Sequence, residues 1–248
     1  MHPAWTKAQW DFDGIGEVLL FDKPLDWTSF DAVKKIRSLF HIRKAGHAGT
    51  LDPRATGLLI VATGAETKNM HRYTMLEKEY VGSMQLGIRT PSFDSETEVV
   101  ERLDFAHITL DAISAAMAQS VGTLMQVPPM YSASKYGGKP LYKYARMGKT
   151  VERAPKEIEV KEFSAVKFDL PHVEFKVVCS KGTYVRTLVD DLGRLLGCGA
   201  CLVSLRRIRI GEYRVEAACS IEAAKELAAK VQPRLSMKYA GSVPAQGN

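Results

Sequence analysis

The sequence lacks a long hydrophobic run. No stretch reaches the about 18 consecutive apolar residues that suggest a membrane-spanning helix. The first residues, MHPAWTKAQWDFDG, also lack the apolar core of a secretory signal peptide. Internal repeats and low-complexity blocks are absent as well. We therefore expect a cytoplasmic protein with no membrane association.

Cysteine is scarce, with four residues in the chain: Cys179, Cys198, Cys201 and Cys219. Two of them, Cys198 and Cys201, have CxxC spacing. A structural zinc site needs a second pair of ligands, and neither a second CxxC pair nor a nearby histidine is present in the sequence. The sequence therefore predicts reduced, partly buried thiols and no metal.

The composition is that of an ordinary globular protein. The chain has 248 residues, of which 46% are hydrophobic and 25% charged, enough for one large domain or two small ones. Its net charge of +6 favours a polyanionic partner such as RNA. Many proteins with this charge bind no nucleic acid, so charge alone leaves the partner open.

The rest of the chain is organised around the stretch KAGHAGTLDPRATG at 44 to 57, where Asp52 is the single acidic residue. Glycines and Pro53 predict a rigid loop without a buried strand or helix, followed by a buried strand at 58 to 63. A polar loop that leads into a buried strand is a common place for a functional site. An ordinary Asp-Pro turn, in which Asp52 accepts backbone hydrogen bonds, is the alternative.

Hydrophobic periodicity predicts a series of strands and helices. Strands are expected at 17–24, 58–63, 78–87, 157–169, 172–180 and 200–213, and helices at 64–76, 108–122, 182–197 and 220–230. A further helix begins at Thr28 or Ser29 and buries Phe30, Val33, Ile36 and Leu39. Its outer face and the residues after it form a basic patch, which is either an RNA surface or an ordinary solvated face: Lys34, Lys35, Arg37, Arg43 and Lys44. Because strands and helices do not alternate regularly, the class is α+β with a mainly antiparallel sheet rather than a Rossmann order.

Tyrosines and cations alternate between about 126 and 156, in the run QVPPMYSASKYGGKPLYKYARMGKTVERAPK. Together they offer stacking surfaces for bases and positive charge for phosphates. The alternative is a prolyl surface loop followed by an amphipathic helix.

The run GHAGTLDPRATG, with DKPLDWTS at 22 to 29 and GAETK at 64 to 68, resembles the catalytic signature of the TruB family, the bacterial tRNA pseudouridine-55 synthases. The resemblance implies the pseudouridine synthase fold, which is a mixed, mainly antiparallel central sheet flanked by helices. It also implies that Asp52 is the catalytic aspartate and that the insertion at 126 to 156 closes over the RNA as a lid.

The resemblance assigns roles to further residues. Arg186, in the motif KGTYVRTL, would pair with Asp52 and keep it charged. A slot for the extruded uracil would be formed by Tyr80, Tyr184 and Leu205. His47 would hold the RNA loop, and Lys23 and Pro24 would support the site. From the residues alone, other readings stay open. Arg186 could pair with Asp190, Tyr80 and Leu205 could be core residues, and His47 could bind backbone.

The implied reaction moves the ribose bond of a uracil from N1 to C5, so it requires no cofactor, metal or redox partner. The aspartate could attack the sugar's anomeric carbon or C6 of the ring, and the sequence does not decide between them. The implied partner is the T-arm stem-loop of tRNA. No protein partner is implied, and we expect a monomer.

The resemblance covers residues 15 to 230. We expect a flexible arm at 1 to 14 and a tail at 231 to 248 that is too short for the PUA domain of many family members. Glu66 stands where the family usually has alanine. Alternative functions are a tRNA folding chaperone, a synthase for another RNA or a guide complex, and, last, a hydrolase that uses Asp52 as a base.

Overall fold

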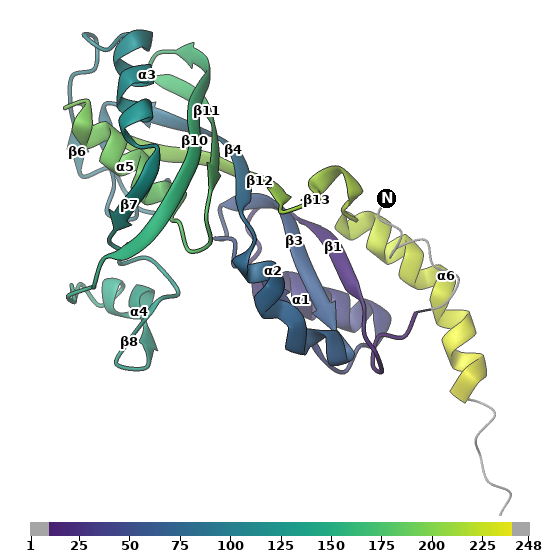
Figure 1. The fold of residues 1–248 in the computed structure, drawn as a ribbon. Coiled ribbons are helices and arrows are strands. Elements are labelled where there is room, and N and C mark those ends of the chain that lie inside the picture. The colour runs from purple at the N-terminus through teal and green to yellow at the C-terminus, as the bar shows by residue number, and fades with distance from the viewer. Residues whose placement is uncertain (1–9, 240–248) are drawn as a thin grey trace, which may run out of the picture. The chain divides into compact units, whose positions relative to one another are not determined.

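The computed structural model describes residues 10–239, and the chain divides into two compact units. The first unit is formed by residues 1–74 and 213–248, and the second by residues 75–212. Figure 1 shows the elements of each unit. None of the helices in the described part of the chain combines the length and the apolar content that crossing a membrane would take.

Three strands of the first unit pair side by side around β3 (Ala55–Thr63). β1 (Val18–Lys23) lies antiparallel to β3 with Leu20 opposite Ile60, and β2 (Ala45–Ala48) lies antiparallel to β3 with His47 opposite Val61. The predicted strands at 17–24 and 58–63 are therefore confirmed. The prediction of a rigid loop without a buried strand at 44 to 57 is wrong at the end of the stretch, where β3 begins at Ala55, and the partly buried β2 forms near its start. Backbone pairing with β3 holds β2, a segment that has no hydrophobic pattern, and the loop between the two strands is formed by residues 49–54.

Helix α1 (Ser29–Phe40) begins with a capping box. The side chain of Thr28 accepts a bond from the N–H of Asp31, and the Asp31 carboxylate accepts one from the N–H of Thr28. The prediction that Phe30 is buried is wrong, because its side chain is 67% exposed. The buried stripe instead passes through Ala32, Val33, Ile36 and Phe40, which places Phe30 outside it.

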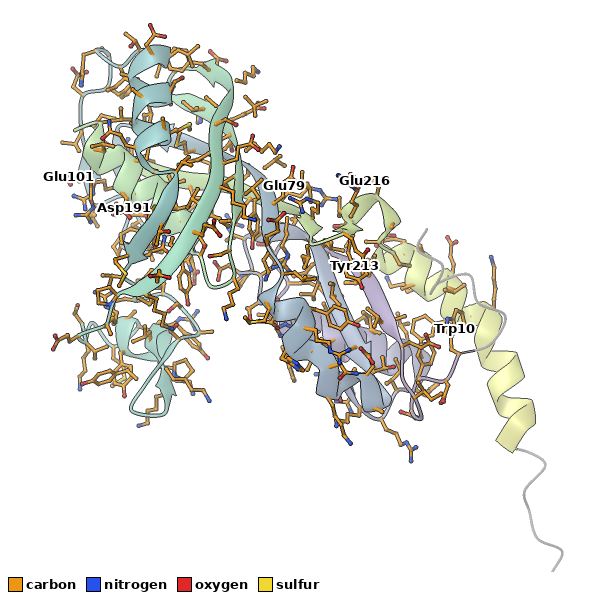
Figure 2. All side chains as sticks on the ribbon, viewed as in Figure 1. Trp10, Glu79, Glu101, Asp191, Tyr213 and Glu216 are labelled. Carbon is orange, nitrogen blue, oxygen red and sulfur yellow. The ribbon has the colours of Figure 1, made fainter. Side chains whose placement is uncertain are left out.

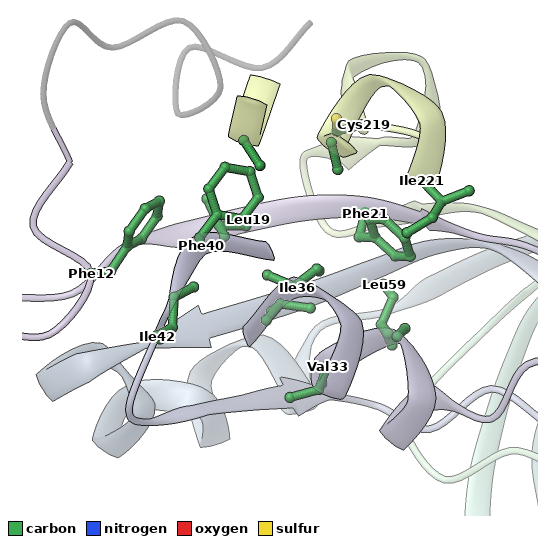
Figure 3. Packing of buried hydrophobic residues seen from close by; sticks show 14 residues of the cluster. Phe12, Leu19, Phe21, Val33, Ile36, Phe40, Ile42, Leu59, Cys219 and Ile221 are labelled. Atoms are coloured by element: carbon green, nitrogen blue, oxygen red, sulfur yellow. The ribbon is translucent and has the colours of Figure 1, made fainter. Parts of the chain in front are cut away.

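Aromatic and aliphatic side chains from both chain segments of the first unit form its core, which Figure 3 shows. Phe12 lies in this core and stacks on Trp10 with ring centroids 5.5 Å apart. Asp11 accepts backbone bonds from Gly14 and Ile15. The arm predicted at 1 to 14 therefore needs correction, because Trp10 and Phe12 pack in the core and Asp11 closes a turn between them and β1. Residues 1–9 lie outside the described part of the chain.

The remaining elements of the first unit are short, apart from the last helix. They are η2 (Gly64–Asn69), α2 (Met70–Met75), whose last residue belongs to the second unit, β13 (Tyr213–Arg214), η3 (Val215–Ala217) and α6 (Ile221–Tyr239). Helix α6 packs against α1 and β1 and buries Ile221, Ala224 and Ala228. It continues nine residues beyond the predicted end at 230, into the segment expected to be a tail, and residues 240–248 lie outside the described part.

The second unit is built on an antiparallel sheet with the strand order β12-β4-β11-β10-β7. The strands are β4 (Lys78–Leu86), β7 (Gly122–Gln126), β10 (Lys156–Asp169), β11 (His172–Cys179) and β12 (Ala200–Ile210). Helix α3 (Leu110–Gln119) packs against β10, and α5 (Val185–Leu195) packs against β12 (Figure 1). The predicted α+β class with a mainly antiparallel sheet is confirmed.

Two short pairs of strands complete the second unit. β5 (Ile88–Arg89) pairs with β6 (Glu101–Arg102), and β8 (Lys135–Tyr136) pairs with β9 (Lys139–Pro140). The second pair and α4 (Leu141–Ala145) lie within the predicted insertion, which projects from the ends of β7 and β10 in Figure 1.

Candidate active site

A buried lysine holds the loop that carries Asp52. The ammonium of Lys23 donates to the carbonyls of Pro24 at 2.9 Å, Trp27 at 2.6 Å and Pro53 at 3.4 Å. Lys23 is fully buried, so these carbonyls supply the polar environment that a buried cation requires. The carbonyl of Pro53 also accepts from the N–H of Asp26 at 2.9 Å. Lys23 therefore fixes the residue that follows Asp52.

The residue before Asp52 is fixed from the opposite side. The N–H of Leu51 donates to Ser29 Oγ at 2.9 Å, and Ser29 Oγ donates back to the Leu51 carbonyl at 3.1 Å. Both residues are buried, whereas Asp52 between the two anchors is partly exposed. The sequence predicts for Ser29 only a place at the start of a helix. Its contact with Leu51 joins residues 22 positions apart, and no local pattern predicts it.

His47 lies on β2, just before the loop, and is partly exposed. Its neighbour Gly46 packs tightly, because a Cβ there would lie 2.6 Å from Met70 Cε. The structure therefore places His47, Lys23, Pro24 and Asp52 in the first unit.

Arg186 is the centre of a buried polar cluster in the second unit. It lies in the first turn of α5 and is 3% exposed. Its Nη1 donates to the carbonyl of Ser92 at 2.8 Å, and its Nη2 donates to that of Tyr131 at 2.9 Å. Its Nε lies 3.4 Å from Asp94 Oδ2. Guanidinium and carboxylate are both buried, so this is a desolvated ion pair.

The alternative pairing of Arg186 with Asp190 is wrong. Asp190 forms an ion pair with Arg194 at 2.7 Å and with Arg89 at 3.5 Å, whereas Arg186 forms one with Asp94 at 3.4 Å. Asp190 instead forms its i to i+4 ion pair with Arg194.

Asp94 is the residue that sequence reasoning missed. It is 4% exposed, and its second carboxylate oxygen accepts the N–H of Glu96 at 2.9 Å. The residue before it, Phe93, has a left-handed φ of 65°, and the Phe93 carbonyl accepts the N–H of Leu202 at 3.0 Å. The turn-rich composition of 88 to 105 signals only a loop, so the burial of this carboxylate is set by tertiary contacts.

Tyr80 and Leu205 lie on the same face of the sheet. Gly82 pairs with Leu205 in the β4–β12 register, and Tyr80 pairs with Arg207, so the four side-chain positions share a face. A Cβ on Gly82 would lie 2.5 Å from the carbonyl of Ser204 and 3.3 Å from Leu205 Cδ1. Glycine therefore makes room for Leu205, which is partly exposed, while Tyr80 is 8% exposed.

Two buried cations lie next to Tyr80. Lys78 begins β4 and is 5% exposed, and Arg207 is 1% exposed. Burial, together with the charge of Arg207, lowers the pKa of Lys78 to about 8. Two buried cationic side chains therefore share the sheet face of Tyr80.

The insertion exposes its positive charge. Lys135, Lys139, Lys143 and Lys149 are exposed, and in the part of the chain that the structure describes none of them lies in an ion pair. Tyr136 and Tyr144 pack edge to face at 5.9 Å between centroids. The guanidinium of Arg146 lies 5.4 Å from the ring centroid of Tyr142 and 3.5 Å from Glu96.

The arginines of the basic patch after α1 have structural partners. Arg37 donates to the carbonyls of Ile42 at 3.3 Å and Arg43 at 2.8 Å, and Arg43 pairs with Asp13 at 3.2 Å. These bonds organise the connection to β2, which favours the solvated-face interpretation for the two arginines.

Glu66, where the chain departs from the family pattern, ties η2 to α2. Its carboxylate accepts from Asn69 Nδ2 at 2.9 Å and from the Tyr73 hydroxyl at 2.8 Å. Burial and the bond to Glu66 raise the pKa of Tyr73. Tyr213, labelled in Figure 2, packs edge to face on Tyr73 with centroids 6.0 Å apart. Glu66 therefore does more than alter packing at a helix start.

No group of three or more acidic, histidine or cysteine side chains that could hold a metal ion occurs among the described residues. All four cysteines are buried. Burial raises the pKa of the Cys179 and Cys219 thiols to about 11.

Two family models match consecutive parts of the chain. The model described as “TruB family pseudouridylate synthase (N terminal domain)” matches residues 37–185, and that described as “tRNA pseudouridylate synthase B C-terminal domain” matches residues 186–235. A protein named tRNA pseudouridine synthase B from Chloroherpeton thalassium is 47% identical over 208 residues, covering 82% of this chain and 86% of its own. One of the same name from Chlorobium luteolum is 49% identical over 215 residues, covering 85% and 74%.

Solved structures share the fold. A chain in the crystal structure of the archaeal box H/ACA sRNP Nop10-Cbf5 complex matches with a TM-score of 0.67 and 25% identity over 92% of this chain. A chain of a Cbf5-Nop10-Gar1 complex matches with a TM-score of 0.64 and 27% identity over 87%. This chain spans 58% of the length of each of these two solved chains.

Proposed function

The chain belongs to the TruB family of pseudouridylate synthases, and we propose that it converts uridine 55 in the T-loop of tRNA to pseudouridine. It is thus an isomerase that has the pseudouridine synthase fold. The observation that carries the proposal is the setting of Asp52. It is the acidic residue of loop 49–54, and its neighbours Leu51 and Pro53 are both held by buried side chains.

In the proposed reaction the bond from ribose C1′ to N1 breaks and a bond from C1′ to C5 forms. N1 gains a proton and C5 loses one, so atoms and charge balance with no external reactant. The Asp52 carboxylate acts as a nucleophile that attacks and then leaves, at either C1′ or C6. A loop that does not have to reorganise keeps the carboxylate at its working position, because misplacement of a catalytic group is costly.

Arg186 is the proposed partner of Asp52 and stabilises its negative charge. Its guanidinium is oriented by two carbonyls and by Asp94, so it is held rigidly before substrate arrives. Tyr80, Tyr184 and Leu205 are the proposed slot for the extruded uracil, and His47 the proposed contact to the RNA loop. The shared sheet face of Tyr80 and Leu205 supports the slot.

The exposed lysines and tyrosines of the insertion support its role as a lid over RNA. We propose the T-arm stem-loop of tRNA as the docking partner and propose that the enzyme is a cytoplasmic monomer. Its catalytic domain includes the predicted range 15–230, together with Trp10 and Phe12 of the core and the rest of α6. A guide-complex function is disfavoured. The relatives named tRNA pseudouridine synthase B are 47–49% identical to this chain, whereas the solved chains from H/ACA complexes are only 25–27% identical.

The direct test is to incubate the purified protein with an unmodified tRNA transcript and to map pseudouridine by carbodiimide-dependent primer extension. We expect one new stop that reports position 55, and none in a transcript with cytidine at that position. Absence of the stop, with an intact protein that binds the transcript, would refute the assignment. A stop at another position would redirect it to another uridine.

A salt titration of tRNA binding tests the insertion. Each phosphate contact that is lost reduces the slope of log K against log salt by about 0.7–0.9. Replacing the four exposed lysines of the insertion with glutamine should flatten the slope, whereas Lys167→Gln, at an exposed lysine on β10, should leave it unchanged. Equal slopes for all three proteins would remove the insertion from RNA binding.

A further inference from the structure

The amide of Gln126 holds the main chain of Tyr184. Gln126 is the last residue of β7, and its Oε1 accepts the N–H of Tyr184 at 2.8 Å. Its Nε2 donates to the carbonyl of Tyr184 at 3.1 Å. The side chain is 4% exposed. Both ends of the amide therefore bind the backbone of one residue, 58 positions further along the chain.

Tyr184 needs such a partner because it is the N-cap of α5. The first N–H groups of a helix have no intrahelical acceptor, and in a capping box a Glu or Gln side chain at N3 accepts the N–H of the N-cap residue. Tyr184 makes no side-chain cap bond. Gln126 supplies an acceptor for its N–H from another element, at the helix end that carries Arg186 in its first turn.

The insertion that follows Gln126 contacts the start of α5 at two more points. The hydroxyls of Ser134 and Tyr184 share a hydrogen bond at 2.9 Å. The carbonyl of Tyr131 accepts from Arg186 Nη2 at 2.9 Å. Gln126 itself is anchored, because it pairs with Lys156 in the β7–β10 ladder. Gln126 thus lies where the rigid sheet ends and the insertion begins, and it joins both to α5.

We propose that Gln126 is a positioning residue for catalysis, which fixes the backbone at Tyr184 and thereby the Tyr184 ring and the Arg186 guanidinium. This inference rests on the proposed function, in which those two side chains face the uracil and Asp52. In this proposal Gln126 itself contacts neither the uracil nor Asp52. Its amide also transmits the position of the insertion to the site, since Val127 and the residues that follow leave the sheet immediately after it.

Two substitutions separate the parts of the contact. Gln126→Met keeps the length of the side chain and removes both hydrogen bonds. Gln126→Glu keeps the acceptor for the Tyr184 N–H and places a carboxylate oxygen against the Tyr184 carbonyl. Gln119→Met is the matched control, because Gln119 is exposed on α3 of the same unit. The measurements are the single-turnover rate on an unmodified tRNA transcript, the Kd for that transcript and the melting temperature.

We expect Gln126→Met to lower the single-turnover rate by about 10- to 100-fold, since a misplacement of about 1 Å carries that order of cost. The Kd should stay within about threefold of the unsubstituted protein, because the RNA contacts of the insertion are retained. Gln119→Met should change neither. A rate within about threefold of the unsubstituted protein would overturn the proposal, as would a loss that the unfolded fraction accounts for. If Gln126→Met does not fold, Gln126→Glu decides by the same criteria.

Hydrogen exchange makes the test independent of which RNA is the substrate. In Gln126→Met the amides of residues 184–188 should exchange at least about tenfold faster, while those of β10 and β11 keep their protection. Unchanged exchange at 184–188, or faster exchange throughout the sheet, would overturn the positioning role. If the unsubstituted protein makes no pseudouridine at position 55, the proposed function fails, and the exchange pattern alone decides for or against Gln126.

Discussion

The buried ion pair between Asp94 and Arg186 allows the most quantitative prediction. Its two charged groups lie 3.4 Å apart with side chains 5% and 4% exposed. At an effective dielectric constant of about 20, their attraction is about 5 kcal/mol. Asp94→Asn removes the charge and keeps the shape, leaving a buried guanidinium without its carboxylate in the second unit. Breaking a buried pair in this way costs about 3–5 kcal/mol.

Urea unfolding at pH 7 measures this cost, and we expect Asp94→Asn to lower the free energy of unfolding by about 3–5 kcal/mol. The matched control is Glu96→Gln, which removes a carboxylate two residues away. Glu96 is 35% exposed in its pair with Arg146, so its loss should cost less than about 1 kcal/mol.

The same substitution should slow catalysis. With Asp94 neutral, Arg186 keeps the carbonyls of Ser92 and Tyr131 but loses the carboxylate that orients its Nε, and the single-turnover rate should fall on the order of 100-fold. The reasoning is refuted if Asp94→Asn and Glu96→Gln show equal stability and equal rates, because the buried pair would then contribute nothing that the exposed pair does not.

Three further predictions concern other parts of the fold. Glu66→Ala removes an acceptor that keeps the Tyr73 hydroxyl protonated. Because the folded-state pKa of Tyr73 is raised, its stability contribution is complete below about pH 10 and is lost above it. Urea unfolding should show that the variant is less stable by about 1 kcal/mol at pH 8 and loses less on going to pH 11; identical curves would contradict this. Gly82→Ala should destabilise by about 1–3 kcal/mol in the same assay, since its Cβ would meet the Ser204 carbonyl at 2.5 Å, and an unchanged stability would show that the sheet yields there. A thiol reagent at pH 8 should modify no cysteine of the folded protein and all of them in urea, because all are buried; rapid labelling of the folded protein would contradict the packing of Cys179, Cys198, Cys201 and Cys219.

Local physics explains what the sequence predicted of the fold. The helix expected to begin at Thr28 or Ser29 is capped by Thr28, and the helix expected at 108–122 is capped by Thr109. Both caps are local, because the bonds to Asp31 and Ala112 join residues three apart. The strands at 78–87 and 172–180 show the alternation of a sheet with one buried face. Elements that depend on neighbouring chain segments were harder to predict. β2 exists because β3 pairs with it, and its own residues carry no strand pattern.

In the candidate site, too, residues in local motifs could be predicted from the sequence, whereas contacts between distant segments could not. Asp52 and Arg186 are proposed as site residues because they lie in motifs that resemble those of a family. The contacts that hold them join segments far apart in the sequence: Ser29 to Leu51, Lys23 to Pro53 and Asp94 to Arg186. Lys23 was expected to support the site, and it could do so through its hydrogen bonds to the carbonyls of Pro24, Trp27 and Pro53, which hold the loop beside Asp52. Asp94 left no signal in the sequence beyond a turn-rich stretch, because burial of a carboxylate is a tertiary property.

Phe30 shows the limit of periodicity. It fits the helical spacing of Val33 and Ile36, yet it is exposed, because the core side of α1 is set by the position of β1 and β2. Arg37 and Arg43 were read as part of a charged surface, while the structure uses them to bind carbonyls and Asp13. Charge in a sequence does not reveal which cations have local partners.

The most direct test of the central claim uses tRNA that carries tritium at C5 of its uridines. Formation of the C5–C1′ bond expels that hydrogen to water, so tritium release counts turnovers. We expect the unsubstituted protein to release one tritium per tRNA, and Asp52→Asn to release none while it binds tRNA with the same Kd. Release by Asp52→Asn at a rate comparable to that of the unsubstituted protein would contradict the assignment of Asp52 as the nucleophile.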